Sequence, residues 1–360
     1  MKNILVQCFA KKDAAPGLAL SMAKGFADGN NQVFCAISDQ IENLDEWLSD
    51  DRLNVTMLDT GNKRSFLTKA LKLCFVTRRE LKRKYAGIDF DLSIQPFVHP
   101  FGVIFNSAIN AKHKMGICHD PNPHTGESFI NRFFSYMGYS STNELIVLTR
   151  SFIDIVKEKY KKPVYYMKLG LLSNCRRADV PESADDGKIN FLFFGRIEKY
   201  KGIEVLINAY SKMCSESTAL TIAGNGDFSE YEPMLTTCTN VNVINRYIQD
   251  DEIGRLFSKK NTILVVPYID ATQSGVIAIA VNYKVPVIAS DTGGLREQLD
   301  DGKIGVLVEP GDVEGLAEAM NQFVKNADLY DEQSKKMAAY KPNLEWATIT
   351  KKLLEEVMEG

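Results

Sequence analysis

The chain has 360 residues and lacks the features that mark several classes of protein. No apolar run approaches the roughly 20 residues of a membrane-spanning helix. The net charge of −3 gives no overall basic surface for nucleic acid. Low-complexity segments and short-period repeats are also missing. These absences argue against a membrane-embedded protein, a nucleic-acid-binding protein and a repeat array.

The seven cysteines are scattered, with no C-x-x-C pair and no spacing typical of metal ligands. Several lie in apolar segments, so we expect reduced, buried thiols in a cytoplasmic protein. The first residues, MKNILVQCFAKKD, form a short apolar run followed by two lysines and an aspartate. This order is typical of a first β-strand and argues against a signal peptide.

Strand and helix patterns alternate along both halves of the chain, which predicts a parallel, doubly wound α/β sheet in each half. The predicted strands are 3–8, 32–37, 55–58, 91–95, 114–118, 145–148 and 164–167, then 190–194, 219–223, 242–244, 263–266, 285–289 and 305–308. The predicted helices include 17–29, 66–85, 150–160, 203–213 and 345–358.

A polar interval of mixed charge, residues 171–188, separates the two series of elements and is predicted to be a linker. The N-terminal domain then covers residues 1–170 and the C-terminal domain covers 189–341. A last segment, 342–360, contains the final helix and can pack on either domain.

The most informative stretch is FLFFGRIEKYKG, residues 191–202. An apolar strand runs into Gly195, and Arg196 and Lys201 precede an apolar-periodic helix that begins at Ile203. Backbone N–H groups at a helix start attract anions, and the planar guanidinium of arginine suits phosphate oxygens. The stretch therefore predicts a diphosphate site. An ordinary strand–helix turn with solvated basic residues is the alternative.

Further glycine-containing turns follow other strands of the second half, at 223–226, 271–276 and 290–294. One such turn is weak evidence for a ligand. Several at successive strand ends of one sheet favour a single phosphate-sized site, because ligands of parallel sheets bind at the carboxyl ends of the strands.

The series GRIEKYKG, IAGNGDF, VPYIDATQSGV, VPVIASDTGGLREQL and IGVLVEPGDVEGLAEAM closely resembles the C-terminal domain of retaining GT-B glycosyltransferases, more narrowly the group 1 family, glycosyltransferase family 4. The tail NLEWATITKKLLEEV, with Trp346, resembles that family's helix that crosses back to the N-terminal domain. The resemblance implies two Rossmann-like domains facing a cleft. The acceptor would bind the N-terminal domain and the nucleotide-sugar donor the C-terminal domain.

By this resemblance, Arg196 and Lys201 hold the diphosphate and neutralise charge on the leaving nucleoside diphosphate. The implied donor-binding residues are Gly17, Gly195, Gly224, Gly226, Gln273, Ser274, Gly275, Val276 and Glu297, with backbone amides acting at 274–276. Gly17 is the one glycine in a loop, residues 11–17, where the family carries several; a flexible link is the alternative. Glu297 is alternatively a carboxylate favoured by a helix dipole.

The sequence departs from the family at two carboxylates. Many members carry two glutamates at places that here hold Ala271 and Ile279. In the family the second glutamate usually holds the ribose hydroxyls, and Ile279 cannot accept a hydrogen bond. Backbone groups or another side chain must then hold the ribose. The base and the sugar stay open, and a UDP- or GDP-linked donor is expected.

All four histidines lie in the N-terminal half. His119 follows a predicted strand and resembles the family's cleft histidine, which contacts the transferred sugar or the reaction centre. Imidazole there can bond a sugar hydroxyl or stabilise charge, so we count His119 with the two cations as catalytic. A satisfied structural histidine is the alternative. Asp120, His124 and His99 are weaker candidates for contact with the acceptor.

Residues 63–84 carry nine lysines or arginines and one acid, Glu80, beside an apolar side. A basic amphipathic helix suits an anionic membrane surface, so a peripheral contact with the inner membrane face is one interpretation. A helix packed on the sheet with a solvated basic face is the other. Nucleic acid is not expected, because no aromatic stacking surface accompanies the charge.

The sequence as a whole predicts a retaining, metal-independent glycosyltransferase. It would move a hexose-like sugar from a nucleotide-sugar to a glycan or lipid-linked saccharide in cell-surface polysaccharide synthesis. No cofactor is expected, and the D-x-D-like stretch at 89–91 leads into a predicted strand. Two alternatives stay open: a sugar-nucleotide epimerase on a GT-B fold, and a non-catalytic nucleotide- or sugar-binding protein.

Overall fold

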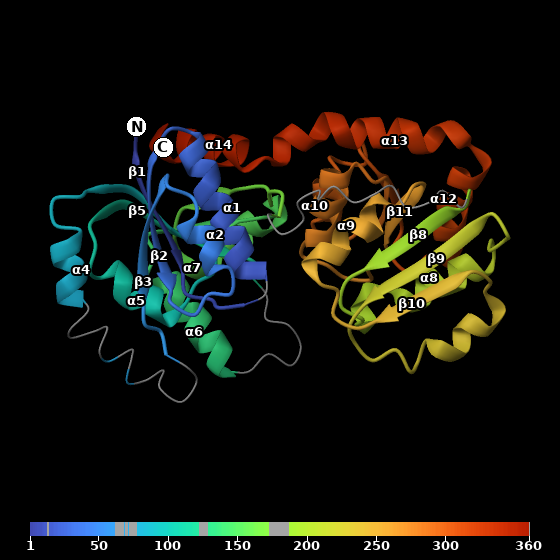
Figure 1. The fold of residues 1–360 in the computed structure, drawn as a ribbon, viewed down its shortest axis with the longest axis horizontal. Helices are drawn as coiled ribbons and strands as arrows, with labels where there is room; N and C mark the ends of the chain where they lie inside the picture. The colour runs from blue at the N-terminus through green and yellow to red at the C-terminus, as the bar shows by residue number, and fades with distance from the viewer. Residues whose placement is uncertain are drawn as a thin grey trace. The chain divides into compact units, whose positions relative to one another are not determined.

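The computed structural model describes residues 1–12, 14–61, 68, 71, 78–121, 129–172 and 187–359. The chain divides into two compact units, one formed by Met1–Ser173 with Glu345–Gly360 and the other by Asn174–Leu344 (Figure 1). Each unit contains one parallel sheet, and each is described by itself.

The first unit is built on a seven-stranded sheet with the order β3-β2-β1-β4-β5-β6-β7, in which all neighbours are parallel. Its strands are β1 (Asn3–Cys8), β2 (Gln32–Ser38), β3 (Leu53–Leu58), β4 (Phe90–Gln95), β5 (Ala111–Cys118), β6 (Glu144–Val147) and β7 (Val164–Tyr166). Leu5 of β1 lies opposite Phe34 of β2 and Ser93 of β4. Along the chain, strands β2 and β3 are added on one side of β1, and strands β4 to β7 are added on the other side. The switch point of the sheet therefore lies between β1 and β4.

Both faces of this sheet are apolar, because successive side chains of a strand point to opposite faces and both sets are hydrophobic. Ile4 and Val6 pack in one cluster with α1 and α14, whereas Leu5 packs in another with Phe101 and Phe105 of α5. The helices are α1 (Ala14–Asp28), α2 (Leu44–Leu48), α4 (Arg78–Lys84), α5 (Pro100–Asn106), α6 (Phe129–Ser140), η2 (Arg150–Phe152), α7 (Ile153–Tyr160) and α14 (Trp346–Glu359).

The C-terminal helix α14 packs beside α1 in the first unit (Figure 1). Trp346 at its start is buried, and its Nε1 donates a hydrogen bond to the carbonyl of Leu171 at 2.6 Å. Ile349, Leu353 and Val357 continue the buried face at helical spacing. The predicted return of this helix to the N-terminal domain is confirmed.

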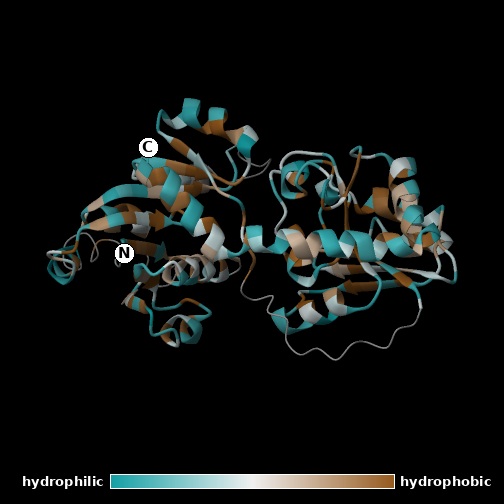
Figure 2. Cartoon of the chain, turned by 90° about the horizontal axis from the view of Figure 1, so that it is seen from above, coloured by the Kyte–Doolittle hydropathy of each residue, from teal (hydrophilic) through white to brown (hydrophobic). Residues whose placement is uncertain are grey.

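The second unit is built on a six-stranded parallel sheet with the order β10-β9-β8-β11-β12-β13. Its strands are β8 (Ile189–Phe194), β9 (Thr218–Gly224), β10 (Val241–Asn245), β11 (Thr262–Val266), β12 (Val287–Ser290) and β13 (Val306–Val308). Figure 2 shows apolar residues along these strands, as expected for a sheet covered on both faces. The switch point lies between β8 and β11, where Phe191 pairs with Ile263.

The connections of the second sheet are mostly helical. They are η4 (Lys199–Lys201), α8 (Ile203–Ser211), η5 (Glu232–Thr237), α9 (Asp250–Ser258), α10 (Gly275–Tyr283), α11 (Leu295–Gln298), α12 (Val313–Lys325), α13 (Ala327–Tyr340) and η6 (Lys341–Leu344). Because the strands are parallel, the turns that leave them all emerge at the same carboxyl edge.

The predicted α/β class with two doubly wound sheets is confirmed, and every predicted strand is present. The predicted start of the first helix at residue 17 is wrong: α1 begins at Ala14, with Pro16 in its first turn, where proline is tolerated. Residues 68, 71 and 78–84 of the predicted helix 66–85 are helical, and its other residues up to 77 lie outside the described part. The cleft between the domains stays a prediction.

None of the helices in the described ranges combines the length and the apolar character that crossing a membrane requires. The free cysteines Cys8, Cys35 and Cys118 are buried, as expected, whereas Cys214 and Cys238 are half-buried. Burial raises the pKa of the Cys118 thiol to about 11. That thiol is therefore protonated at neutral pH and a poor nucleophile.

Candidate anion-binding site

The candidate site lies at the carboxyl edge of the second sheet, where β8 and β11 run side by side. Arg196 and Lys201 follow β8, and the segment from Pro267 to Ser274 follows β11 and leads into α10. These two strands flank the switch point, where the connections run in opposite directions and leave room for a ligand.

Two glycines bring the turns of this edge into contact. Gly202, with φ +67°, would place a Cβ only 1.9 Å from the carbonyl oxygen of Pro267. Gly224, with φ +159°, would place one 1.8 Å from the carbonyl oxygen of Gly195. Any larger residue would push the turns apart. Gly224 thus has a packing role between two turns, which the prediction of a donor contact did not include.

Lys201 is the more buried of the two cations. Its Nζ donates a hydrogen bond to Oη of Tyr268 at 2.7 Å and lies 3.9 Å from the centre of that ring. Arg196 extends into solvent, with 74% of its side chain exposed, and pairs with Glu198 at 2.9 Å. Lys201 is thus held by the end of β11, although it belongs to the turn after β8.

Burial, with a smaller contribution from the charge of Arg196, lowers the pKa of Lys201 to about 8, while Glu198 opposes this effect. Desolvation and a like charge both disfavour the ammonium form. The free energy cost of placing two cations together is relieved when an anion lies between them. This electrostatic arrangement suits a phosphate or diphosphate.

The start of α10 supplies the second half of the site. Ser274 is the extended residue before the helix, and its Oγ donates to Oη of Tyr268 at 3.2 Å. Gln298 of α11 brackets the Ser274 backbone: its Oε1 accepts from the N–H at 2.7 Å and its Nε2 donates to the C=O at 3.0 Å. The N–H groups of Gly275 and Val276 begin the helix and have no intrahelical partner.

The hydrogen bonds of Gln298 to the Ser274 backbone correct one prediction. The amide of Ser274 was predicted to bind the diphosphate, but it donates to Gln298. The amides of Gly275 and Val276 are the ones that this end of α10 directs outward. Sequence reasoning missed both Tyr268 and Gln298. Their signals are modest: Tyr268 is the second residue after β11, in VPYID, and Gln298 directly follows the candidate Glu297.

The other predicted donor residues lie around the same edge. Gly195, with φ +135°, has open space where a Cβ would point. Gly226 bridges to Ile197 and donates from its N–H to Oδ1 of Asn245 at 3.3 Å. Oε1 of Gln273 is buried and has no hydrogen-bond partner among the described residues. It is therefore an available acceptor beside the start of α10. Glu297 is half-buried in the short helix α11.

The two positions that lack the family's carboxylates are both buried. Ala271 is 9% exposed and Ile279 is 4% exposed. Ile279 faces the core of the second unit from α10. A carboxylate at such a place would need a partner to offset its desolvation, whereas the aliphatic side chain packs without one.

His119 of the first unit directly follows β5. Its ring stacks on Phe97, with centroids 4.2 Å apart, and its Nε2 lies 2.7 Å from the carbonyl oxygen of Pro96. A carbonyl can only accept, so Nε2 carries the hydrogen. Burial lowers the pKa of His119, although the Pro96 contact and Asp120 oppose this effect. The ring is neutral at pH 7, and its Nδ1 is a hydrogen-bond acceptor.

His99 caps the helix α5. Its Nδ1 accepts a hydrogen bond from the N–H of Phe101 at 3.2 Å. Burial lowers its pKa to about 4, with a smaller contribution from the charge of Lys11. This capping bond occupies one ring nitrogen. It gives His99 a structural role that does not require contact with an acceptor sugar.

Two further predicted site residues of the first unit are Gly17 and His124. Gly17 lies in the first turn of α1 and is buried, and its carbonyl accepts from Oγ of Ser21 at 2.8 Å. The predicted loop 11–17 is therefore wrong from Ala14 onward. His124 lies outside the described residues, as do most residues of the basic segment 63–84.

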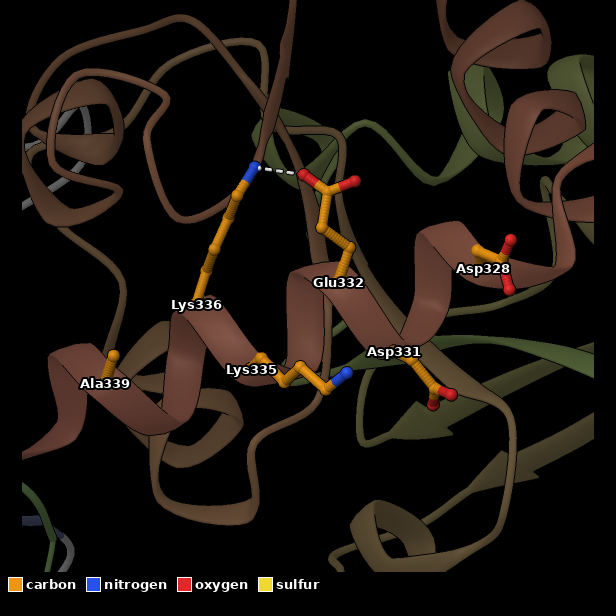
Figure 3. Close-up of a pocket in the computed structure, with 6 residues that line it drawn as sticks. All are labelled: Asp328, Asp331, Glu332, Lys335, Lys336 and Ala339. Carbon is orange, nitrogen blue, oxygen red and sulfur yellow. Dashed lines mark ion pairs between the residues drawn. The ribbon is translucent and has the colours of Figure 1, made fainter.

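A separate pocket lies along α13 (Figure 3). Its lining comes from one helix, namely Asp328, Asp331, Glu332, Lys335, Lys336 and Ala339, and Lys336 pairs with Glu332 at 2.7 Å. Its acids and bases nearly balance, and none of the predicted site residues contributes to it. The charge pattern therefore gives no reason to place the anion there.

Residues 188–326 match the family model described as "Glycosyl transferases group 1". The chain is 30% identical over 149 residues to an uncharacterized glycosyltransferase of Methanocaldococcus jannaschii, covering 39% of this chain and 37% of that one. It is 27% identical over 168 residues to phosphatidyl-myo-inositol mannosyltransferase of Mycobacterium leprae, covering 45% and 44%. The chain thus spans about two fifths of the length of these curated relatives.

The fold as a whole is similar to that of solved structures. Anabaena Alr3699/HepE, crystallised in complex with UDP, is 15% identical with a TM-score of 0.72, and all of both chains is covered. Sucrose-phosphate synthase from Thermosynechococcus elongatus is also 15% identical, with a TM-score of 0.66 over the whole of both chains. At this identity the likeness concerns the fold, which is GT-B.

Proposed function

We propose that the chain is a glycosyltransferase that uses a nucleotide-sugar donor, and the match of residues 188–326 to the group 1 glycosyl transferase model supports this. The observation that carries the proposal is the meeting of Arg196, Lys201 and the start of α10 at one switch point. Two cations and free helix N–H groups together offer the donors that a diphosphate accepts.

The donor is a UDP- or GDP-linked hexose. Alr3699/HepE has been crystallised with UDP and with UDP-glucose, which supports testing uridine first. No carboxylate stands at Ile279, so the ribose is held by backbone groups or by an amide such as Gln273, whose Oε1 is a buried acceptor. Loss of the usual carboxylate is expected to weaken ribose recognition rather than diphosphate binding.

In the reaction, Lys201 and Arg196 stabilise the charge that develops on the leaving nucleoside diphosphate. Fixed donors aimed at developing charge are commonly the largest catalytic contribution. Transfer proceeds with retention and without a metal ion, and the leaving phosphate acts as the base for the incoming hydroxyl. The neutral ring of His119, with Nδ1 as acceptor, suits a hydroxyl of the transferred sugar.

The acceptor is a glycan or a lipid-linked saccharide in cell-surface polysaccharide synthesis. The name of the mycobacterial relative, phosphatidyl-myo-inositol mannosyltransferase, refers to a lipid acceptor and supports the lipid-linked choice. Peripheral contact of the segment 63–84 with the inner face of the membrane belongs to the same proposal, and so does a cytoplasmic location. The exposed, strongly basic helix α4 is the described part of that segment.

The first test is binding of nucleotides, namely three nucleoside diphosphates and one monophosphate. UDP, GDP, ADP and CMP are titrated into wild type, Arg196→Ala and Lys201→Ala while the thermal midpoint is recorded. A ligand that binds only the folded state raises the midpoint. Lys199→Ala is the matched control, because Lys199 lies in the same turn but is 82% exposed and pairs with Glu230.

We expect one nucleoside diphosphate to stabilise wild type and Lys199→Ala, and to lose most of its effect on the other two variants. If no nucleotide raises the wild-type midpoint, the proposal fails and a binding protein for another ligand takes its place. Equal shifts in all four proteins would place the nucleotide away from the two cations.

The second test separates a transferase from an epimerase. Wild type is incubated with the stabilising nucleotide-sugar, with and without a mixture of saccharide acceptors, and the products are separated. Release of nucleoside diphosphate that depends on acceptor supports transfer. Conversion of the donor to an isomer without acceptor supports the epimerase instead.

A further inference from the structure

One oxygen atom joins the two halves of the candidate site. Oη of Tyr268 accepts from Nζ of Lys201 at 2.7 Å, which reaches it from the turn after β8. It also accepts from Oγ of Ser274 at 3.2 Å, at the start of α10. A phenolic oxygen has the capacity for both bonds. The cation and the helix N-terminus are thus connected through a single side chain.

Tyr268 is well placed to hold other groups, because it is itself held. The residue is 1% exposed, and its ring packs edge-on against Tyr200 with centroids 6.2 Å apart. Burial raises the pKa of its hydroxyl well above the ordinary value, so the group stays neutral at working pH. A buried, neutral phenol is a fixed hydrogen-bond acceptor at physiological pH.

Lys201 needs such an acceptor. Its side chain is long and flexible, and the charge of Arg196 from the same turn repels it. The other groups that face it are Glu198 and the Tyr200 ring from its own turn, and Tyr268 from the end of β11. Of the described residues, Tyr268 alone accepts a hydrogen bond from its Nζ, and that bond draws the ammonium toward α10.

We propose that Tyr268 is a positioning residue of the donor site, whose hydroxyl holds the Lys201 ammonium beside the start of α10. The cation and the helix N–H groups then meet the same diphosphate. The proposal rests on the proposed function and deepens it, because it names a residue that acts on the ligand through Lys201.

The test is a double-mutant cycle on nucleoside diphosphate affinity, measured by calorimetry with the diphosphate that stabilises wild type, UDP first. Tyr268→Phe removes the hydroxyl and keeps the ring. We expect it to weaken binding about tenfold, since hydrogen bonds to charged groups are among the stronger ones. In a Lys201→Ala background the same change is expected to have little further effect, because its target is gone.

Tyr210→Phe is the matched control. Tyr210 is a fully buried tyrosine of the same unit, and its hydroxyl bonds to the carbonyl of Thr239 at 2.9 Å and lies near Thr218, the first residue of β9. It therefore loses a buried hydrogen bond at the opposite edge of the same sheet. We expect it to lower the thermal midpoint without changing nucleotide affinity.

A pH profile distinguishes positioning from mere packing. A hydrogen bond to the charged form favours that form, so the hydroxyl of Tyr268 helps keep Lys201 protonated. In Tyr268→Phe the loss of affinity at alkaline pH should begin at a lower pH than in wild type. Ser274→Ala removes the second bond to the hydroxyl and should give a smaller loss that is not additive with Tyr268→Phe.

The outcomes separate the two proposals. If wild type binds none of the diphosphates, the proposed function fails and the positioning role fails with it. If wild type binds and Tyr268→Phe binds equally well, or if its effect adds fully to that of Lys201→Ala, the positioning role alone is overturned. Should Tyr268→Phe not fold, a Ser274→Ala effect that is absent, or that adds fully to that of Lys201→Ala, overturns it in the same way.

Discussion

At the switch point of the second sheet two cations meet near the end of one strand. Beside the switch point of the first sheet, by contrast, the rings of His99 and His119, which follow β4 and β5, are neutral. Burial and the charge of Arg196 lower the pKa of Lys201, and a bound anion relieves the cost of keeping its ammonium charged. His119 and His99 are kept neutral by burial, and one ring nitrogen of each is already bonded to backbone.

The comparison separates topology from chemistry. Both sheets are parallel and reverse direction at one point, so both offer a place for a ligand. The charges at that place decide which ligand suits it: in the proposed function, a diphosphate suits the second unit and an uncharged hydroxyl compound suits the first. Function therefore has to be argued from the site and not from the fold.

The largest expected effect is a loss of stability when the close contact between the turns after β8 and β11 is disturbed. Gly202→Ala should lower the free energy of unfolding by roughly 3–4 kcal/mol, because it combines a left-handed backbone with a close approach to the Pro267 carbonyl. Gly87→Ala, also at positive φ but with no atom within 4 Å, should lower it by only about 1 kcal/mol. Urea denaturation of both variants gives the values, and equal losses would contradict the role of the close contact.

The next effect concerns the neutral histidines of the first unit. The pKa of His99 is lowered from 6.5 to about 4, so stability is full above pH 6.5 and falls as the pH drops toward 4. The loss should reach about 3 kcal/mol. His99→Asn, which keeps a capping acceptor, should reduce it, and His119 accounts for part of the remainder because burial also lowers its pKa. Urea denaturation at pH 7, 5 and 4 measures this, and an unchanged slope in His99→Asn would argue against the assignment.

The third effect is specific to the second unit. Lys201→Ala should weaken nucleoside diphosphate binding by about 2 kcal/mol, or roughly thirtyfold, because a charge-assisted contact is lost. Lys199→Ala should bind like wild type, since that lysine is solvated and paired with Glu230. Isothermal titration calorimetry compares the two, and a comparable loss in both variants would mean that general surface charge dominates.

A fourth, smaller effect is the pH dependence of that binding. The free protein loses the Lys201 proton near pH 8, and a bound diphosphate favours the ammonium form. Affinity should therefore be constant below pH 8 and fall by up to about tenfold per pH unit above it. Lys201→Arg keeps its charge throughout this range and should flatten the profile. A wild-type profile that is already flat to pH 9 would exclude Lys201 as the titrating group.

The smallest effect on binding sharpens the contrast between the units. His119→Ala should leave nucleoside diphosphate affinity within about twofold of wild type and lower the transfer rate, as expected for contact with the sugar only. His113→Ala is the control, because that ring bonds Glu144 at 2.8 Å on the strand surface. Equal transfer rates in both variants would assign His119 a purely structural role.

Much of this architecture was accessible from the sequence. Alternating apolar strands and amphipathic helices predicted both sheets, and Gly195, Arg196 and Lys201 were identified because they stand between a strand and a helix start. The error at α1 arises because Ala14 and Ala15 carry no strong N-terminal signal and Pro16 is as typical of a loop as of a first helical turn. Local pattern therefore located the elements better than their ends.

The sequence by itself determined the two parallel sheets and the cations at the end of β8, because periodicity and turn residues act locally. Only the tertiary structure decided three hydrogen bonds. Tyr268 accepts from the ammonium of Lys201, Gln298 accepts from the amide of Ser274, and His99 caps a helix. These contacts join side chains that are distant in the chain or depend on burial. Burial and the charge of Arg196 then lower the pKa of Lys201, and the extent of burial cannot be read from any single segment of the sequence.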